Sequence, residues 1–151
     1  MGIEKDIQQT SFRNEHQKLG INIMYTANWL NEKIASILSQ EDITQQQYNI
    51  LRILRGADKP LSTLQIRARM LDKMSDTSRI VDRLVAKELV EKNTCPTDKR
   101  LVDVTLTKKG FAILEKLDQL NHHLDSLMKG ISEKEAHTMN QLLDQLRDAS
   151  K

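Results

Sequence analysis

Apolar residues recur every three or four positions over the stretch from about Phe12 to Ser39. This spacing places them on one face of an α-helix, so the stretch is predicted to be a single amphipathic helix. The repeating positions are Ile23, Ala27, Leu30, Ile34 and Ile37, and Trp29 and Leu38 widen the stripe. Because such a helix is about twice the average length, part of it is expected to pack beyond its own domain.

Short helices are predicted to follow, each opened by a cap. Thr44 and Ser62 are each followed three residues later by a glutamine, the pattern of a capping box. The first helix ends near Gly56, and Pro60 in the loop 57–60 prevents it from continuing. The second runs from Thr63 to about residue 71. The inward residues of the first helix are predicted to be Tyr48, Leu51 and Leu54.

A third short helix is predicted from about Ser75 to Lys87. The positions predicted to face the core are Ile80, Val81, Leu84 and Val85. The exposed face is then polar and basic, with Ser75, Asp76, Ser78, Arg79, Asp82 and Arg83.

The hydrophobic period then changes from helical to alternating. Residues 89–93 and 101–106 are predicted to be two strands, the second with a strict period of two. The segment 94–100 between them is polar and basic, and its Pro and Asp residues favour a turn. The two strands therefore form a hairpin with a basic tip.

Helical periodicity returns at Thr107, a plausible cap, and continues to Gly130. Its apolar positions alternate at spacings of four and three, as in a coiled coil. They are Ile113, Leu117, Leu120, Leu124 and Leu127. Ser132 and Glu135 form a third capping box, which opens a last helix. That helix presents Met139, Leu142, Leu143 and Leu146.

This order of elements predicts a mainly α protein with a small β-hairpin wing. Residues 44–106 are predicted to form a winged helix-turn-helix domain that binds DNA. Residues 1–43 and 107–151 are predicted to form a helical dimerisation region, which makes one compact unit with the domain. Ordinary packing within one chain is the alternative for these terminal helices.

Composition narrows the class of protein. The chain has 151 residues, of which 29% are charged, so it is expected to be one soluble globular unit. No apolar run approaches a membrane span, and the first ten residues lack the apolar core of a secretory signal. Cys95 is the single cysteine, which excludes an intrachain disulfide and favours a cytoplasmic location.

The net charge of +2 is unevenly distributed. Residues 1–58 carry 6 Lys and Arg against 7 Asp and Glu, a net charge of −1. Residues 59–110 carry 12 against 7, or +5, and residues 111–151 carry 5 against 7, or −2. A basic middle segment between mildly acidic ends suits a polyanionic partner such as DNA.

Several stretches carry a resemblance to a known family. They are Ser75-Asp76-Thr77-Ser78-Arg79-Ile80-Val81-Asp82-Arg83-Leu84, Leu89-Val90-Glu91-Lys92, Asp98-Lys99-Arg100 and Leu106-Thr107-Lys108-Lys109-Gly110. With these stretches the chain resembles the MarR/SlyA family of bacterial transcription regulators. The resemblance implies an obligate homodimer with interlocked terminal helices, and release of DNA when a small aromatic ligand binds. Many members have Arg after the first wing strand, where this chain has Lys92 and Asn93.

The third short helix is predicted to read bases in the major groove. Arg79 can make a bidentate contact to guanine, Asp76 can accept from a cytosine amine, and the hydroxyl groups suit bases or phosphates. The predicted base-reading residues are Ser75, Asp76, Ser78, Arg79 and Arg83. The alternative is a solvated amphipathic helix, with Arg79 paired to Asp76 or Asp82.

The predicted wing residues are Asp98, Lys99 and Arg100. The resemblance implies that Arg100 enters the minor groove, and Asp98 would orient its guanidinium. Alternatively, Asp98 only caps the turn, and the two roles are compatible. The predicted phosphate contacts are Ser62, Thr63, Lys73 and Lys92.

Weaker signals concern ligands. A speculative pocket for an aromatic effector would be lined by Met24, Tyr25, Trp29, Tyr48 and Phe111, which are core residues in the alternative interpretation. Cys95 is a redox candidate beside two lysines, or an ordinary free thiol. His122 and His123 would bind a metal only with His16 and Asp125 in an assembled dimer, so no metal or cofactor is predicted.

No catalytic motif accompanies these features, so an enzyme is not expected. The sequence predicts a homodimeric transcription regulator that binds a pseudo-palindromic operator in double-stranded DNA. A repressor that a small effector releases is favoured. The alternative is a helical dimeric protein-interaction module, but such a module has no need of the basic wing tip at 98–100.

Overall fold

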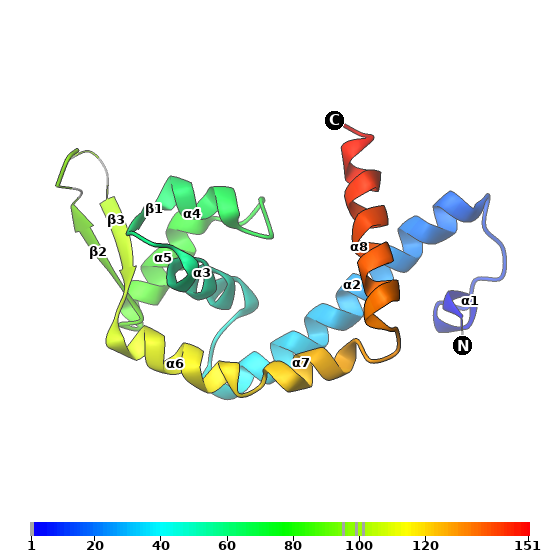
Figure 1. Ribbon diagram of the computed structural model, residues 1–151, viewed down its shortest axis with the longest axis horizontal. Coiled ribbons are helices and arrows are strands. Elements are labelled where there is room, and N and C mark those ends of the chain that lie inside the picture. Colours follow the sequence, from blue (N-terminus) through cyan, green and yellow to red (C-terminus); the bar gives the residue numbers. More distant parts are fainter. Residues whose placement is uncertain (1, 95, 99, 101) are drawn as a thin grey trace. The chain divides into compact units, whose positions relative to one another are not determined.

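The computed structural model describes residues 2–94, 96–98, 100 and 102–151 (Figure 1). These residues form helices and a small antiparallel sheet, in the order predicted from the sequence. The helices are α1 (Ile3–Asp6), α2 (Glu15–Leu38), the 3₁₀ helix η1 (Ser39–Glu41), α3 (Gln45–Gly56), α4 (Thr63–Arg69), α5 (Thr77–Ala86), α6 (Lys108–Asp118), α7 (Asn121–Leu127) and α8 (Glu133–Asp148). The strands are β1 (Leu61–Ser62), β2 (Val90–Thr94) and β3 (Val102–Leu106).

The chain divides into two compact units, one ending at Asp118 and one spanning Gln119–Lys151. The first unit contains the elements from α1 to α6, including the whole sheet. The second contains α7 and α8. No helix among the residues described above is both long and apolar enough to cross a membrane.

All three predicted capping boxes are present. Thr44, Ser62 and Ser132 each accept a hydrogen bond from the backbone N–H three residues later. The side chain of that third residue returns a bond to the backbone N–H of the cap. These local motifs fix the starts of α3, α4 and α8, because they satisfy donors that the helix itself leaves unpaired.

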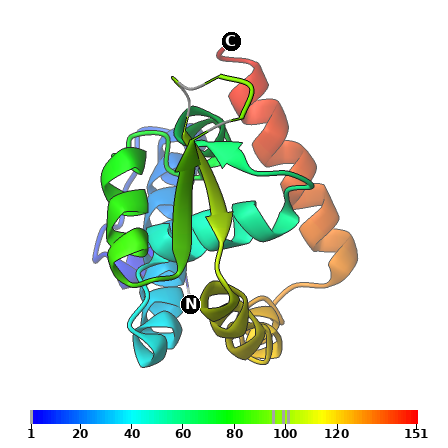
Figure 2. The same cartoon turned by 90° about the vertical axis from the view of Figure 1, so that its left-hand side faces the viewer.

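The sheet has the strand order β1-β3-β2, and both pairings are antiparallel (Figure 2). Val90 pairs with Leu106 and Thr94 with Val102, which confirms the predicted hairpin. The two-residue strand β1 was not predicted, because two residues carry no periodicity. It pairs Leu61 with Val104, and so ties the start of α4 to the wing.

The core of the first unit is formed by the helix-turn-helix and the sheet together. Ile66 on α4 and Val81 and Leu84 on α5 are fully buried. The same holds for the other central side chains, Ile50, Leu51, Leu61 and Val104. Helix α3 therefore packs against α4, α5 and strand β3.

The junction between the sheet and α6 requires a glycine. Thr107 caps α6 by accepting from the N–H of Gly110 at 3.0 Å, as predicted for this residue. Its own N–H donates to the carbonyl of Leu89 at 3.1 Å. A Cβ at Gly110 would lie 2.3 Å from that same carbonyl oxygen. The glycine of the Leu-Thr-x-x-Gly pattern is therefore required because the backbone at Leu89, just before β2, lies against α6.

Three predictions about this architecture are wrong in detail. Helix α5 begins at Thr77, two residues later than predicted. Val85 is 37% exposed and does not join the core. The predicted continuous helix after Thr107 is broken at Gln119 and Leu120, between α6 and α7. Propensity and spacing alone do not reveal this break, since neither Gly nor Pro marks it.

The long helix α2 confirms the first predicted helix, but its apolar stripe is poorly covered. Leu38 is its only buried residue among those described. Trp29 in the stripe is 38% exposed, and Ile23, Leu30, Ile34 and Ile37 are only half-buried. Outside the stripe, Met24 is 62% exposed and Leu19 46%. In the second unit, α8 has no buried residue among those described, and Leu142 is 59% exposed.

Candidate nucleic-acid interface

Helix α5 presents a polar and basic face above a buried apolar one. Asp76 is its N-cap, and the carboxylate accepts a hydrogen bond from the N–H of Arg79 at 3.2 Å. Ser78, Arg79 and Arg83 are exposed as predicted. The exposed face of α5 therefore offers Ser78 and Arg79 near its start and Arg83 in its last turn, while the opposite face is held by the core.

Ser75 does not lie where the sequence predicted. It precedes α5, is only 8% exposed, and its hydroxyl lies 3.2 Å from the side-chain nitrogen of Gln46, which donates to it. The prediction that Ser75 belongs to the exposed face is wrong. The apolar period of α5 does not extend back to this residue, because the cap at Asp76 turns the chain.

The turn between α4 and α5 is fixed by side chains on both sides. Asn49 on α3 accepts from the N–H of Leu71 at 3.0 Å. Asp72 accepts from the N–H of Met74 at 3.0 Å, and this hydrogen bond is the main reason that the pKa of Asp72 is lowered. Together with the bond from Gln46 to Ser75, these contacts hold the start of α5 at a fixed position over α3.

Two of the lysines predicted to contact phosphates already have partners. Lys92 on β2 forms an ion pair with Asp82 on α5, so it links the wing to this helix. The ammonium of Lys73 donates to the carbonyl of Ala68 at the end of α4. Both side chains are exposed enough to exchange these partners for a phosphate.

The wing tip carries the predicted pair of Asp98 and Arg100. The guanidinium Nε and one terminal nitrogen each donate to a different carboxylate oxygen at 3.1 Å. The carboxylate also accepts from the backbone N–H of Arg100 at 3.0 Å. Asp98 thus orients the guanidinium and also closes the turn, so the two roles are combined, while the contact of Arg100 with DNA stays a prediction. These hydrogen bonds from Arg100 lower the pKa of Asp98.

The Arg100 side chain is 90% exposed despite this pairing. It is therefore a fixed cation that projects into solvent from the tip of the hairpin. Lys99 and Cys95 lie outside the described residues, so their predicted roles are not addressed by the structure.

Two cavities connect the wing to the start of α5. One of about 800 Å³ lies between the wing tip and the start of α4, and Arg100, Ser62 and Lys59 line it. Another of about 520 Å³ lies between α4 and the start of α5, with Arg67 and Ser78 in its wall. Thr63 and Leu64 line both. One continuous surface therefore runs from Arg100 past the start of α4 to Ser78.

Sequence reasoning overlooked the apolar residues on this surface. Leu64 is 76% exposed and Met74 is 92% exposed. The available signal was the spacing around Leu64, which lies two positions before the buried Ile66 and so on another face of α4.

The speculative effector residues do not share one environment. Tyr48 is 9% exposed on α3, and the guanidinium of Arg52 lies 5.7 Å from its ring centroid. The other four residues are exposed on α2 and α6: Met24, Tyr25, Trp29 and Phe111. A single chain therefore leaves most of this set open to solvent.

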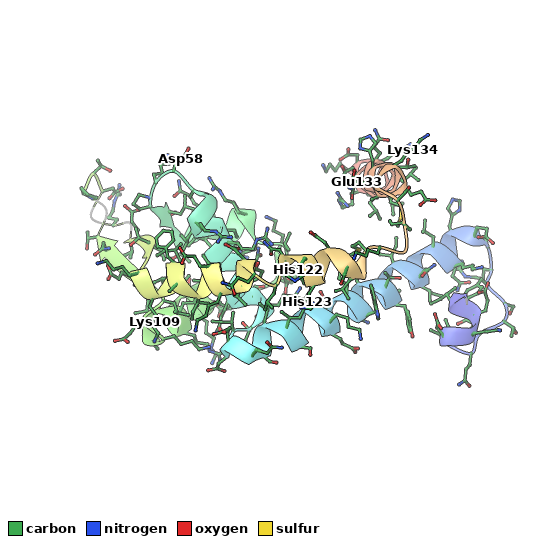
Figure 3. All side chains as sticks on the ribbon, turned by 60° about the horizontal axis from the view of Figure 1, so that its bottom comes forward. Asp58, Lys109, His122, His123, Glu133 and Lys134 are labelled. Atoms are coloured by element: carbon green, nitrogen blue, oxygen red, sulfur yellow. The ribbon has the colours of Figure 1, made fainter. Side chains whose placement is uncertain are left out.

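The two histidines of α7 stack on one another, with ring centroids 4.9 Å apart (Figure 3). Among the residues that the structure places, no group of three or more His, Cys, Asp or Glu side chains is arranged to hold a metal ion. The dimer-only metal site remains untested.

Comparison with known proteins gives a consistent result. A model of the MarR family matches residues 41–101. The multiple antibiotic resistance protein MarR of Escherichia coli is 32% identical over 134 residues, which cover 86% of this chain and 91% of that protein. HTH-type regulator MhqR of Bacillus subtilis is 25% identical over 83% of this chain and 87% of its own.

Solved structures agree with the sequence matches. A mutant Escherichia coli MarR complexed with operator DNA has a TM-score of 0.81 and 30% identity. The match covers 91% of this chain and 99% of the other. The Staphylococcus aureus MepR–DNA complex, at 20% identity and a TM-score of 0.78, covers 86% and 96% and supports the fold alone. The element order, the three-stranded wing and the helix-turn-helix are those of a winged helix protein.

Proposed function

The chain belongs to the MarR family of transcription regulators, and we propose that it is a homodimeric repressor that binds a pseudo-palindromic operator. The observation that carries the proposal is the continuous surface from the paired Arg100 to the exposed start of α5. A similar chain, 30% identical, has been solved in complex with operator DNA. The cytoplasm is its proposed place of action.

On this proposal the base contacts come from the exposed start of α5. Arg79 and Arg83 are suited to guanine, because a guanidinium can donate two parallel hydrogen bonds to its O6 and N7 atoms. Asp76 already accepts from the helix backbone, which leaves its second carboxylate oxygen for a cytosine amine. Ser75 is better suited to position the turn, since its hydroxyl is bonded to Gln46.

Arg100 is the proposed minor-groove contact. Its guanidinium is fixed by Asp98, so little conformational entropy is lost when it binds. Narrow minor grooves concentrate negative potential, which favours an inserted cation. Ser62 and Thr63 at the start of α4, together with Lys73 and Lys92, are the proposed phosphate contacts. They add salt-dependent affinity without sequence choice.

The terminal helices are the proposed dimerisation region, and residues 44–106 the proposed DNA-binding domain. The support is the large exposed apolar area on α2 and on α8, which a partner would cover. A two-fold axis would also place two base-reading helices about 34 Å apart, which is one turn of DNA.

Repression and effector release are the finer parts of the proposal. A compact dimer bound to a promoter obstructs polymerase without further domains, so repression needs the fewest components. The exposed aromatic residues of α2, Tyr25 and Trp29, are the proposed contacts for a small aromatic effector at the dimer junction.

Random-site selection with the purified protein tests this function most directly. We expect enrichment of an inverted repeat, and binding of one dimer per site with a strong dependence on salt. Binding of random duplexes without any enriched repeat would contradict the proposal. It would instead favour the alternative, a helical dimeric interaction module without sequence-specific DNA binding.

A further inference from the structure

Large apolar side chains are exposed on α4 and on the turn that leads to α5. Leu64 is 76% exposed, Leu71 79% and Met74 92%. Their neighbours Ile66 and Met70 are 0% and 2% exposed. The segment therefore buries its inner face completely, and the three outward residues are not part of that core.

Two of these residues lie on the proposed DNA-binding surface. Leu64 and Met74 line the same cavity of about 520 Å³, next to Ser78 at the start of α5. Leu64 also lines the cavity that Arg100 reaches. Leu71 is different, because it lines a separate cavity together with residues of α2 and α3, among them Asn31.

The position of Met74 is fixed before any ligand binds. Its N–H donates to Asp72, and the adjoining Ser75 is held by Gln46. The N–H of Leu71, at the other end of the turn, donates to Asn49. A fixed backbone lowers the entropic cost of using the side chain in recognition.

The charge around the two residues indicates what covers them. Arg67 and Asp76 line their cavity, and Arg79 is exposed nearby on the first turn of α5. The Asp76 carboxylate already accepts a hydrogen bond from the N–H of Arg79. Two guanidinium groups beside one carboxylate that the helix backbone binds therefore favour a ligand that combines negative charge with small apolar groups. The major groove of DNA meets both conditions, because phosphates flank it and the C5-methyl group of thymine projects into it.

We propose that Leu64 and Met74 are specificity-determining residues that contact thymine methyl groups in the major groove of the operator. The proposal rests on the proposed DNA-binding function. It adds an apolar part to the readout, beside the hydrogen bonds from Arg79 and Arg83. Operators are then expected to contain thymine at the positions that flank the contacts of α5.

Replacing thymidine by 2′-deoxyuridine, one position at a time, in the selected operator duplex removes only the methyl group. We expect one or two positions per half-site at which this change weakens binding about fourfold, the factor for burial of one methyl group. The same replacement elsewhere in the duplex should leave the affinity unchanged.

The variants Leu64→Ala and Met74→Ala locate the partner of each methyl group. At the sensitive positions, thymidine and deoxyuridine duplexes should bind equally well to the matching variant, which is the signature of a direct contact in a double-mutant cycle. Leu71→Ala is the matched control, since it removes an equally exposed side chain from another cavity, and it should keep the full sensitivity. Thermal unfolding and sedimentation establish that each variant is a folded dimer.

The outcomes separate this inference from the proposed function. Absence of any sequence-specific duplex would contradict both. A selected operator that tolerates deoxyuridine everywhere would contradict the apolar readout and leave DNA binding intact. Undiminished sensitivity in both Leu64→Ala and Met74→Ala, or conversion of either variant to a monomer, would also overturn the assignment.

Discussion

From α3 to α6 the chain buries an apolar core of its own and leaves Leu64, Leu71 and Met74 outside it, whereas α2 buries only Leu38 and α8 buries no residue among those described. Leu51 on α3 is 0% exposed, but Leu142 on α8 is 59% exposed and Met24 on α2 is 62% exposed. Both regions show the same helical periodicity in sequence. The difference teaches that the winged region is complete within one chain, while the terminal helices need a partner surface to be covered.

The largest expected effect is on dimerisation, through the exposed apolar residues of α8. Leu142→Asp would place an unpaired carboxylate in the proposed dimer contact, which costs about 3–5 kcal/mol and converts the dimer to monomers. Analytical ultracentrifugation measures the change. Asn140→Asp is the matched control, because residue 140 lies on another face of α8 and carries the same new charge. An unchanged dimer in Leu142→Asp would contradict the role of α8.

Truncation of a buried side chain between α3 and α6 should affect folding instead. Leu51→Ala is expected to lower the free energy of unfolding by about 2–5 kcal/mol, because it leaves a cavity at a fully buried position of α3. Leu71→Ala removes the same atoms from a side chain that is 79% exposed, and should cost much less. Urea denaturation followed by circular dichroism compares the two. Equal losses would contradict the contrast between buried and exposed positions.

The wing tip should affect DNA binding alone. Arg100→Ala removes a charge-assisted contact and is expected to weaken operator binding by about 1.5–3 kcal/mol, at least tenfold in Kd. The dimer and the free energy of unfolding should stay as they are, because the side chain is 90% exposed. Fluorescence anisotropy and sedimentation test the two parts. Conversion to monomers would show that the wing belongs to the dimer contact.

The smallest expected effect is on the pKa of the Asp98 carboxyl at the wing tip. The hydrogen bonds from Arg100 lower the pKa of Asp98, so this carboxylate stays ionised below the usual range of an aspartate. The ion pair therefore stabilises the folded wing fully at pH values above that range. This stabilisation is lost as the pH falls through the lowered pKa of Asp98. Carbon-13 NMR titration of the Asp98 carboxyl measures it, and Arg100→Ala should raise the value. An equal pKa in both proteins would mean that the pair does not form in solution.

Much of the winged region, and the start of α8, could be predicted because the signals are local. The capping pairs at Thr44, Ser62 and Ser132 specify helix starts within four residues. The alternating strand after residue 101 predicted the hairpin, and the Asp98–Arg100 pair required only a two-residue turn. Hydrogen bonds between residues close in the chain specify these features, so they can be predicted from the sequence alone.

Other features depend on contacts between distant residues. Ser75 is buried because Gln46, 29 residues earlier, reaches its hydroxyl. Strand β1 exists because Leu61 meets Val104 across the sheet. Leu64 and Met74 lie on one surface only because α4 and α5 pack at a particular angle over α3. No periodicity within either segment encodes these relations.

The sequence by itself determined the order of the main elements, the starts of α3, α4 and α8 and the basic hairpin, since each follows from residues a few positions apart. The tertiary structure decided where α5 begins, which apolar residues remain exposed, and how the wing, α4 and α5 share one surface. The physical reason is that burial and surface continuity arise from packing, which joins segments that the chain keeps far apart.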